Sequence, residues 1–314
     1  MNQPGQNKTL SDSPSPRLVV AKDPVPATGF QGRKFLPTAN YDLAGTLDSG
    51  QAFRWQQYDE AWEGVIGSYF VRLRPTGGGI QAETATATAD WGWLEEFLQS
   101  KTDLAAVLKT FPADAPMTAA VESCNGLRLL RQDPWECLAS FILSSTKQIV
   151  QIRQIISLLC SRYGEPITVP DGMSPVFAFP SPAKIASATE DELRACKMGF
   201  RAPGLLLAAQ RIDGGQFDLE SLRKMSHAEA RQKLMTLHGV GAKIADCVLL
   251  FAYGFDSAFP LDVWVKRALQ QLYFPRRRAS EKRLQRFSAT YFGPHAGYAQ
   301  QYLFHYMRTK RKSG

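Results

Sequence analysis

Residues 234–246 read Leu-Met-Thr-Leu-His-Gly-Val-Gly-Ala-Lys-Ile-Ala-Asp, and this stretch decides the fold of the second half of the chain. An apolar helix end meets a Gly-Val-Gly turn, and a second helix starts at once. Two glycines around one aliphatic residue allow a tight backbone reversal. The N–H groups of Gly239, Val240 and Gly241, next to a helix N-terminus, can face a phosphate. A plain turn between two helices is the alternative, because Gly-x-Gly alone is a weak signal.

Lys243 lies in the first turn of that second helix, where the helix dipole disfavours a cation. A lysine at this position costs stability, which indicates a function. Nineteen residues later, Asp262 follows Pro260 and starts another apolar helix. Aspartate is a favoured N-cap, so an ordinary helix cap is the alternative interpretation of Asp262.

Helix starts follow one another beyond about residue 115. Asp133, Pro134 and Glu136 combine an N-cap, a proline at the first helical position and the acid of a capping box. Further capping boxes and one apolar stripe with a glycine at its end support the same interpretation: Thr189 with Glu192, Ser226 with Glu229, and Ile149, Ile152, Ile155, Ile156 and Leu159 before Gly164. We therefore predict an all-helical domain over residues 115–314.

The first part of the chain has a different pattern. Residues 1–30 hold five of the nineteen prolines and almost no periodic apolar signal, so we expect a disordered tail. Residues 31–114 are predicted to form an antiparallel sheet with one buried face, since Tyr69, Val71 and Leu73 alternate with other residues before a Gly77–79 turn. Trp91, Leu94, Phe97 and Leu98 recur at helical spacing and predict a helix on that sheet. The fold class is therefore α+β.

Composition narrows the class of protein. The 314 residues are 44% hydrophobic and 21% charged, which excludes general disorder. The chain has no long apolar run and no secretory signal, so we expect no membrane association and a place in the cytoplasm, nucleoid or nucleus. Five cysteines without a CxxC pair argue against disulfides and an iron–sulfur cluster.

Positive charge is concentrated near the C-terminus. Residues 266–312 hold twelve basic residues against one acid, Glu281. Clustered cations favour a polyanion, most plausibly nucleic acid, because binding releases condensed counterions. For the last group, Arg308, Lys310, Arg311 and Lys312, a solvated tail is an equal alternative.

The hairpin with its lysine and the Pro-Leu-Asp loop resembles the helix-hairpin-helix DNA glycosylases. Further motifs in the same order resemble the 8-oxoguanine DNA glycosylase/lyase family, over roughly residues 33–308. These motifs are SGQAFRW (49–55), GLRLLRQDPWEC (126–137), MGFRA (198–202) and GYAQ (297–300). The resemblance implies an enzyme that removes 8-oxoguanine from double-stranded DNA and then cleaves the strand.

The resemblance also implies roles for single residues. Lys243 matches the nucleophile that attacks C1′ and forms a Schiff base, and Asp262 matches the carboxylate that stabilises positive charge at C1′. Gly50 matches the glycine whose carbonyl accepts the N7–H of oxidised guanine. Cys247 and Phe304 match the pair that sandwiches the flipped base, and Gln300 matches the amide that reads its edge. From the residues alone, Cys247 and Phe304 would be core residues and Gln300 a surface amide.

Contacts to DNA follow from the same resemblance. The amides of Gly239, Val240 and Gly241 would hold the DNA backbone, with a structural cation at the hairpin as the one metal the resemblance allows. His238 replaces the usual proline before the first glycine, and a phosphate contact or a neutral exposed imidazole are the two interpretations. Phe200 stands where a tyrosine wedge is usual, beside a retained Arg201.

Other departures concern the base opposite the lesion. Thr146 and Gln151 replace the asparagine and arginine that the family uses to read cytosine, which predicts weaker discrimination among opposite bases. Trp264 stands where a histidine is common, and the sequence gives no account of that change. We expect a monomer without a cofactor. Two alternatives remain: a related glycosylase for an alkylated purine, or a non-enzymatic DNA-binding protein with the same hairpin.

Overall fold

The N-terminal part of the protein is built on an antiparallel sheet. The computed structural model describes residue 1, residues 29–145 and residues 147–310. The expected tail of residues 1–30 therefore falls almost entirely outside the described residues. The sheet has the strand order β1-β5-β4-β3-β2, and each neighbouring pair is antiparallel as predicted. Its strands are β1 (Gly32–Pro37), β2 (Trp55–Tyr58), β3 (Ala61–Ile66), β4 (Tyr69–Thr76) and β5 (Gly79–Thr84).

A short helix that the sequence pattern did not reveal joins β1 to β2. Helix α1 (Leu43–Asp48) begins at Asp42, whose carboxylate accepts a hydrogen bond from the Gly45 N–H at 2.8 Å. Leu43 and Leu47 are buried under the sheet, so the helix is fixed to the core. It ends directly before Ser49 and Gly50, and this position fixes where the Gly50 loop starts.

Both faces of the sheet are covered, by different parts of the chain, so the prediction of a single buried face is wrong. Helix α2 (Gly92–Leu98) packs on one face, as the apolar spacing predicted, with Leu94 fully buried. On the other face, Val65 and Phe70 pack against Ile167. Ile167 belongs to a short ladder of β6 (Pro166–Ile167) and β7 (Val176–Phe177), which is the one strand pair found in the otherwise helical region among the described residues.

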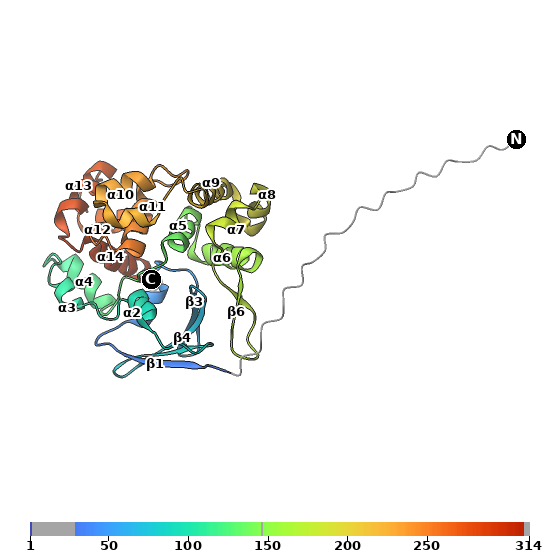
Figure 1. Ribbon diagram of the computed structural model, residues 1–314. Helices are drawn as coiled ribbons and strands as arrows, with labels where there is room; N and C mark the ends of the chain where they lie inside the picture. Colours follow the sequence, from blue (N-terminus) through green and yellow to red (C-terminus); the bar gives the residue numbers. More distant parts are fainter. Residues whose placement is uncertain (2–28, 146, 311–314) are drawn as a thin grey trace.

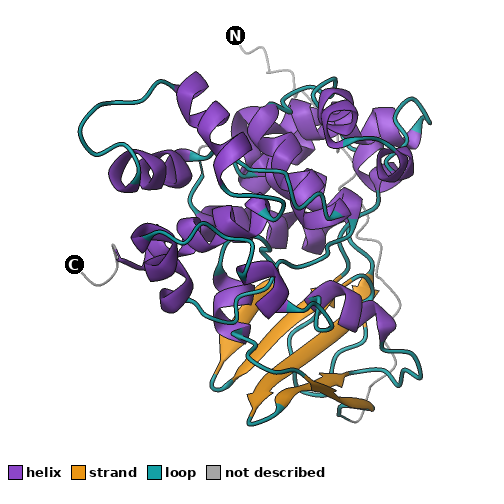
Figure 2. Cartoon of the chain, turned by 90° about the vertical axis from the view of Figure 1, so that its left-hand side faces the viewer, coloured by secondary structure: helices purple, strands orange, loops and turns teal. Residues whose placement is uncertain are grey.

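The rest of the described chain is helical and forms the larger layer above the sheet (Figures 1 and 2). No described helix is both long and apolar enough to cross a membrane. The remaining elements are α3 (Leu104–Leu108), α4 (Ala115–Ser123), α5 (Pro134–Leu143), α6 (Ile149–Tyr163), α7 (Pro182–Ala186), α8 (Glu190–Leu193), η1 (Arg194–Met198), η2 (Gly199–Arg201), α9 (Ala202–Asp213), η3 (Glu220–Lys224), α10 (His227–Leu234), α11 (Ala242–Val248), η4 (Leu249–Tyr253), α12 (Val263–Leu272), α13 (Glu281–Tyr291) and α14 (Ala296–Lys310).

Most of the predicted helix ends are present. Asp133 caps α5, and the boxes at Thr189 and Ser226 have both of their hydrogen bonds. Glu136 differs from the prediction: its carboxylate pairs with Arg54 at 3.4 Å, because the fold brings the end of the SGQAFRW segment beside α5. Gly164 does cap α6, but in an extended conformation. A side chain there would lie 2.1 Å from the Ala178 carbonyl oxygen, so close backbone approach is what requires glycine.

The core of the sheet and the core of the helical region each include side chains from the other side of the predicted domain boundary at residue 114. Leu104 and Val107 precede the boundary but pack into the core of the helical region. Leu130 follows it and packs into the core of the sheet. Each core thus contains residues from both sides of residue 114, and the boundary stays a prediction.

Candidate active site

The glycine-rich turn lies between α10 and α11. Gly239 has a φ of +78°, which lets the chain reverse within a few residues. Leu237 and Val240 point into the core and anchor the turn, whereas His238, Gly239 and Gly241 are exposed. The Val240 N–H donates to the Leu237 carbonyl at 3.1 Å, so it is used inside the turn. The N–H groups of Gly239 and Gly241 have no acceptor among the described residues and remain available to a ligand.

The amine of Lys243 is directed towards α5. Lys243 is half-buried in the first turn of α11, and its Nζ donates to the Ser144 Oγ at 3.3 Å. The same nitrogen lies 5.3 Å from the centre of the Phe141 ring. Ser144 caps the C-terminal end of α5, and Phe141 is buried in its last turn. The amine is therefore held against the protein by a hydroxyl and an aromatic face.

Asp262 is an N-cap and a member of the same site. One carboxylate oxygen accepts from the Val265 N–H at 2.7 Å, so the helix-cap interpretation is correct. Burial raises the pKa of this carboxyl, while the Val265 hydrogen bond and the positive charge of Lys243 lower it in part. The Lys243 amine is close enough for its charge to act on this carboxyl, although the two groups form no ion pair in the described structure. The hydrogen bond from Val265 fixes the orientation of the carboxylate.

Cys247 lies one turn after Lys243 on α11. Its thiol is buried, and burial raises its pKa to about 12, against a lowering by Lys243 and a further raising by Asp262. The thiol is therefore neutral at physiological pH and behaves as a small apolar group. Lys243, Asp262 and Cys247 form one electrostatically coupled group. Within residues 29–145 and 147–310, no cluster of His, Cys, Asp or Glu is placed to hold a metal ion.

A second group of predicted residues surrounds Gly50. Gly50 has a φ of +82°, and a methyl added there would lie 3.4 Å from Cε1 of Phe304. Gln300 lies one turn before Phe304 on α14. Its Oε1 is buried and has no hydrogen-bond partner among the described residues, so it is free to accept from a ligand. Phe304 packs against the same helical core that contains Cys247, but their sandwich around a base stays a prediction.

The residues expected to contact DNA elsewhere have different surroundings. Phe200 is 60% exposed in the short η2 helix, and the guanidinium of Arg201 lies 4.5 Å from the centre of its ring. Gln151 is exposed, and its side-chain oxygen accepts from the Gln148 N–H at 3.0 Å in a capping box at the start of α6. Thr146 lies outside the described residues.

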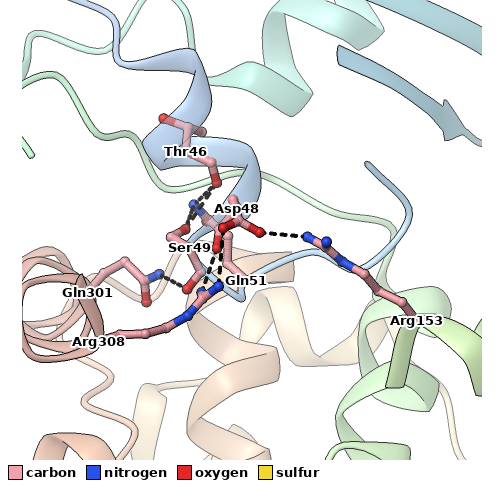
Figure 3. A network of polar contacts seen from close by, with 7 residues as sticks. All are labelled: Thr46, Asp48, Ser49, Gln51, Arg153, Gln301 and Arg308. Carbon is pink, nitrogen blue, oxygen red and sulfur yellow. Dashed lines mark hydrogen bonds and ion pairs between the residues drawn. The ribbon is translucent and has the colours of Figure 1, made fainter. Parts of the chain in front are cut away.

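The sequence missed an ionic network beside Gly50. The Asp48 carboxylate accepts from Arg153 at 2.9 Å and from Arg308 at 3.2 Å (Figure 3). Arg308 is therefore part of the site rather than of a solvated tail. The residue spacing gave no signal for this network, because its members come from α1, α6 and α14.

Comparison with known proteins finds two families along the chain. Residues 35–138 match the family described as 8-oxoguanine DNA glycosylase, N-terminal domain, and residues 139–294 match the HhH-GPD superfamily base excision DNA repair protein. The chain is 30% identical to the N-glycosylase/DNA lyase OGG1 of Arabidopsis thaliana, over 96% of this chain and 88% of the plant protein. It is 29% identical to a probable N-glycosylase/DNA lyase of Methanothermobacter thermautotrophicus, over 87% of this chain and 95% of that protein.

A solved structure has a similar fold over most of the chain. The Clostridium acetobutylicum 8-oxoguanine glycosylase/lyase, in complex with double-stranded DNA containing cytosine opposite 8-oxoG, superposes with a TM-score of 0.81. The two chains are 31% identical, and the match covers 86% of this chain and 93% of the other. The fold, the hairpin and the matched segments together define a base-excision protein of the helix-hairpin-helix class. Within that class, the chain belongs to the 8-oxoguanine DNA glycosylase family.

Proposed function

We propose that this protein excises 8-oxoguanine from double-stranded DNA and then cleaves the strand at the resulting abasic site. The observation that carries the proposal is the position of Lys243 directly after the hairpin, where its amine is held against α5 and its charge acts on the carboxyl of Asp262. A protein that only binds DNA needs the hairpin amides but has no use for a half-buried amine whose charge acts on a half-buried carboxyl. Membership of the family and the Gly50 loop favour oxidised guanine over an alkylated purine as the lesion.

Lys243 supplies the nucleophile in this reaction. Its nitrogen forms a bond to C1′ while the bond from C1′ to the base breaks, and the base leaves with the electron pair and takes up a proton. The nitrogen then loses one proton, the C1′–O4′ bond breaks, and O4′ takes up a proton, which leaves a protonated Schiff base between Lys243 and C1′. Removal of a proton from C2′ then breaks the C3′–O bond and cleaves the strand. Asp262, as a carboxylate, stabilises the positive charge at C1′ during the first step.

Selection of the lesion takes place around Gly50. The flipped base would lie against Phe304, with the neutral Cys247 thiol on its other side and the free Gln300 oxygen at its edge. The Gly50 carbonyl would accept the N7–H of 8-oxoguanine. Guanine has a lone pair in place of that hydrogen, so it loses one hydrogen bond and leaves the carbonyl unpaired.

Two surfaces would hold the DNA. The free N–H groups of Gly239 and Gly241 would bind phosphate, and the exposed Phe200 ring would wedge into the opened duplex. The protein would act as a monomer in the compartment that contains the DNA of its cell.

The base opposite the lesion should have little influence on the rate of excision. Because the Gln151 amide oxygen is already used to cap α6, we expect excision rates within about tenfold of one another for the four opposite bases. A strong preference for cytosine would contradict this expectation.

Borohydride trapping tests the nucleophile and the lesion together. The wild-type protein should form a covalent adduct with an oligonucleotide duplex that contains 8-oxoguanine, and not with undamaged duplex. Lys243→Gln should abolish the adduct while binding to the duplex persists. An undiminished adduct with Lys243→Gln would remove this residue as the nucleophile, and a stronger adduct with an alkylated purine would change the substrate.

A further inference from the structure

The backbone carbonyls on both sides of Gly50 are all occupied by side chains from distant parts of the chain. The Asp48 carbonyl accepts from Arg308 at 2.6 Å, and the Ser49 carbonyl accepts from Gln301 at 3.1 Å. The Gln51 carbonyl accepts from Gln132 at 2.7 Å. Among the described residues, nothing donates to the carbonyl of Gly50 itself. The loop is therefore fixed before and after the one carbonyl that is left for a ligand.

Two helices hold this loop from opposite sides with the same spacing. On α6, Ile149 touches the Gly50 position and Arg153, one turn later, pairs with Asp48. On α14, Phe304 touches the Gly50 position and Arg308, again one turn later, pairs with Asp48. Figure 3 shows the two arginines approaching the Asp48 carboxylate from different helices. Residues four apart lie on one helix face, so each helix contributes one apolar and one ionic contact to the loop.

The ionic contacts are stronger constraints than exposed ion pairs of the same kind. The side chains of Arg308, Arg153 and Asp48 are 16%, 25% and 34% exposed, so water screens them only in part. Arg308 uses one nitrogen for the Asp48 carbonyl and another for its carboxylate, which fixes both the backbone and the side chain of the same residue. Such charge-assisted, two-point contacts restrict geometry as well as add energy.

We propose that Asp48, Arg153 and Arg308 are positioning residues that hold the Gly50 carbonyl where it can accept the N7–H of oxidised guanine. The proposal rests on the proposed function, because it assigns a cause to the geometry of the lesion-reading group. Selectivity depends on one hydrogen bond, whose strength falls steeply once distance and angle leave the normal range. A loop that is free to shift would keep its fold but lose the difference between 8-oxoguanine and guanine.

The test separates base removal from strand cleavage in the same preparation. Arg308→Met should lower the single-turnover rate of 8-oxoguanine excision about tenfold or more, as expected for a misplaced binding group. Strand cleavage at a preformed abasic site needs Lys243 but no base recognition, so it should stay within about twofold of wild type. Arg308→Lys should recover part of the excision rate, because it restores one charged donor.

Two further variants complete the design. Arg153→Met should likewise lower 8-oxoguanine excision while abasic-site cleavage stays within about twofold of wild type. The substitution should be tolerated, because Arg153 lines an open pocket of about 590 Å³. Lys184→Met is the matched control, since it removes an exposed ion pair with Glu165 far from the loop, and it should change neither activity. If Arg308→Met does not fold, as judged by thermal unfolding, Arg153→Met and Arg308→Lys decide the question alone.

Failure of the inference and failure of the proposed function have different signatures. If wild-type protein does not distinguish 8-oxoguanine from guanine, the proposed function fails. If wild type distinguishes them and the arginine variants do so equally well, only the positioning role fails. A parallel loss of base excision and abasic-site cleavage would also overturn the positioning role, because it would show general damage to the structure.

Discussion

Substitution of Gly50 by alanine gives a sharp test of the lesion pocket. The backbone has a φ of +82° at this position, and a side chain in that region costs about 1–2 kcal/mol. The new methyl would lie 3.0 Å from the Cδ1 of Ile149 and 3.4 Å from the ring of Phe304, which adds roughly 1–2 kcal/mol of overpacking. The sum of about 2–4 kcal/mol should lower the melting temperature by roughly 3–7 °C in a chain of this size.

The same methyl should affect catalysis far more than stability. It enters the space between Gly50 and Phe304 where the base is expected, so 8-oxoguanine excision should fall about a hundredfold. Cleavage of a preformed abasic site should persist, since Lys243 and Asp262 are not touched. Gly67→Ala is the matched control: Gly67 has a φ of +58° in the turn between β3 and β4, and no atom lies within 4 Å of its added methyl. Wild-type excision by Gly50→Ala, measured in single turnover at a temperature where the variant is folded, would refute the assignment.

Four further predictions concern Asp262, Phe200 and the basic segment. Because burial raises the pKa of Asp262, its carboxylate forms only above the ordinary aspartate range. The excision rate of the wild type should therefore fall as the pH drops through that raised pKa. Asp262→Asn should be slow at every pH and should not show this decrease. At pH values above this raised pKa, the ionised carboxylate lowers the free energy of unfolding. Asp262→Asn keeps a capping side chain and should therefore not lower the melting temperature at pH 7. A clear decrease would contradict this expectation. Phe200→Ala should change stability by less than about 0.5 kcal/mol but slow excision about tenfold, and an unchanged signal from a fluorescent base next to the lesion would exclude the wedge. Replacing the exposed arginines 276–278 by serine should reduce the slope of log affinity against log salt by about 2.7, measured by anisotropy, and an unchanged slope would place DNA elsewhere.

Local signals in the sequence were sufficient for the elements that depend on neighbouring residues. The caps at Asp133, Thr189 and Ser226 involve partners three residues away, so a single chain segment specifies them. The turn at Gly239 and the N-cap at Asp262 are local in the same sense. The resemblance to a known family then supplied the roles of these residues, which no local pattern contains.

Features that depend on distant residues could not be predicted in this way. The partners of Asp48 lie 105 and 260 residues further along the chain, and neither arginine is unusual in its own helix. Helix α1 was hidden because its six residues are too few to show a period. The β6–β7 ladder has two residues in each strand and exists because it covers Val65 and Phe70 on the outer face of the sheet.

The exchange of side chains between the two cores has a consequence for how this protein can be taken apart. A fragment ending near residue 114 would lack Leu130 from the sheet core, and its Leu104 and Val107 would lose the helices they pack against. The complementary fragment would lack Leu104 and Val107 from the core of the helical region, and its Leu130 would lose the sheet that it packs against. Heating should therefore unfold the sheet and the helices in a single cooperative transition. A chimera that joins one half of this chain to a relative would also need Leu104, Val107 and Leu130 to be transferred with the core into which each of them packs.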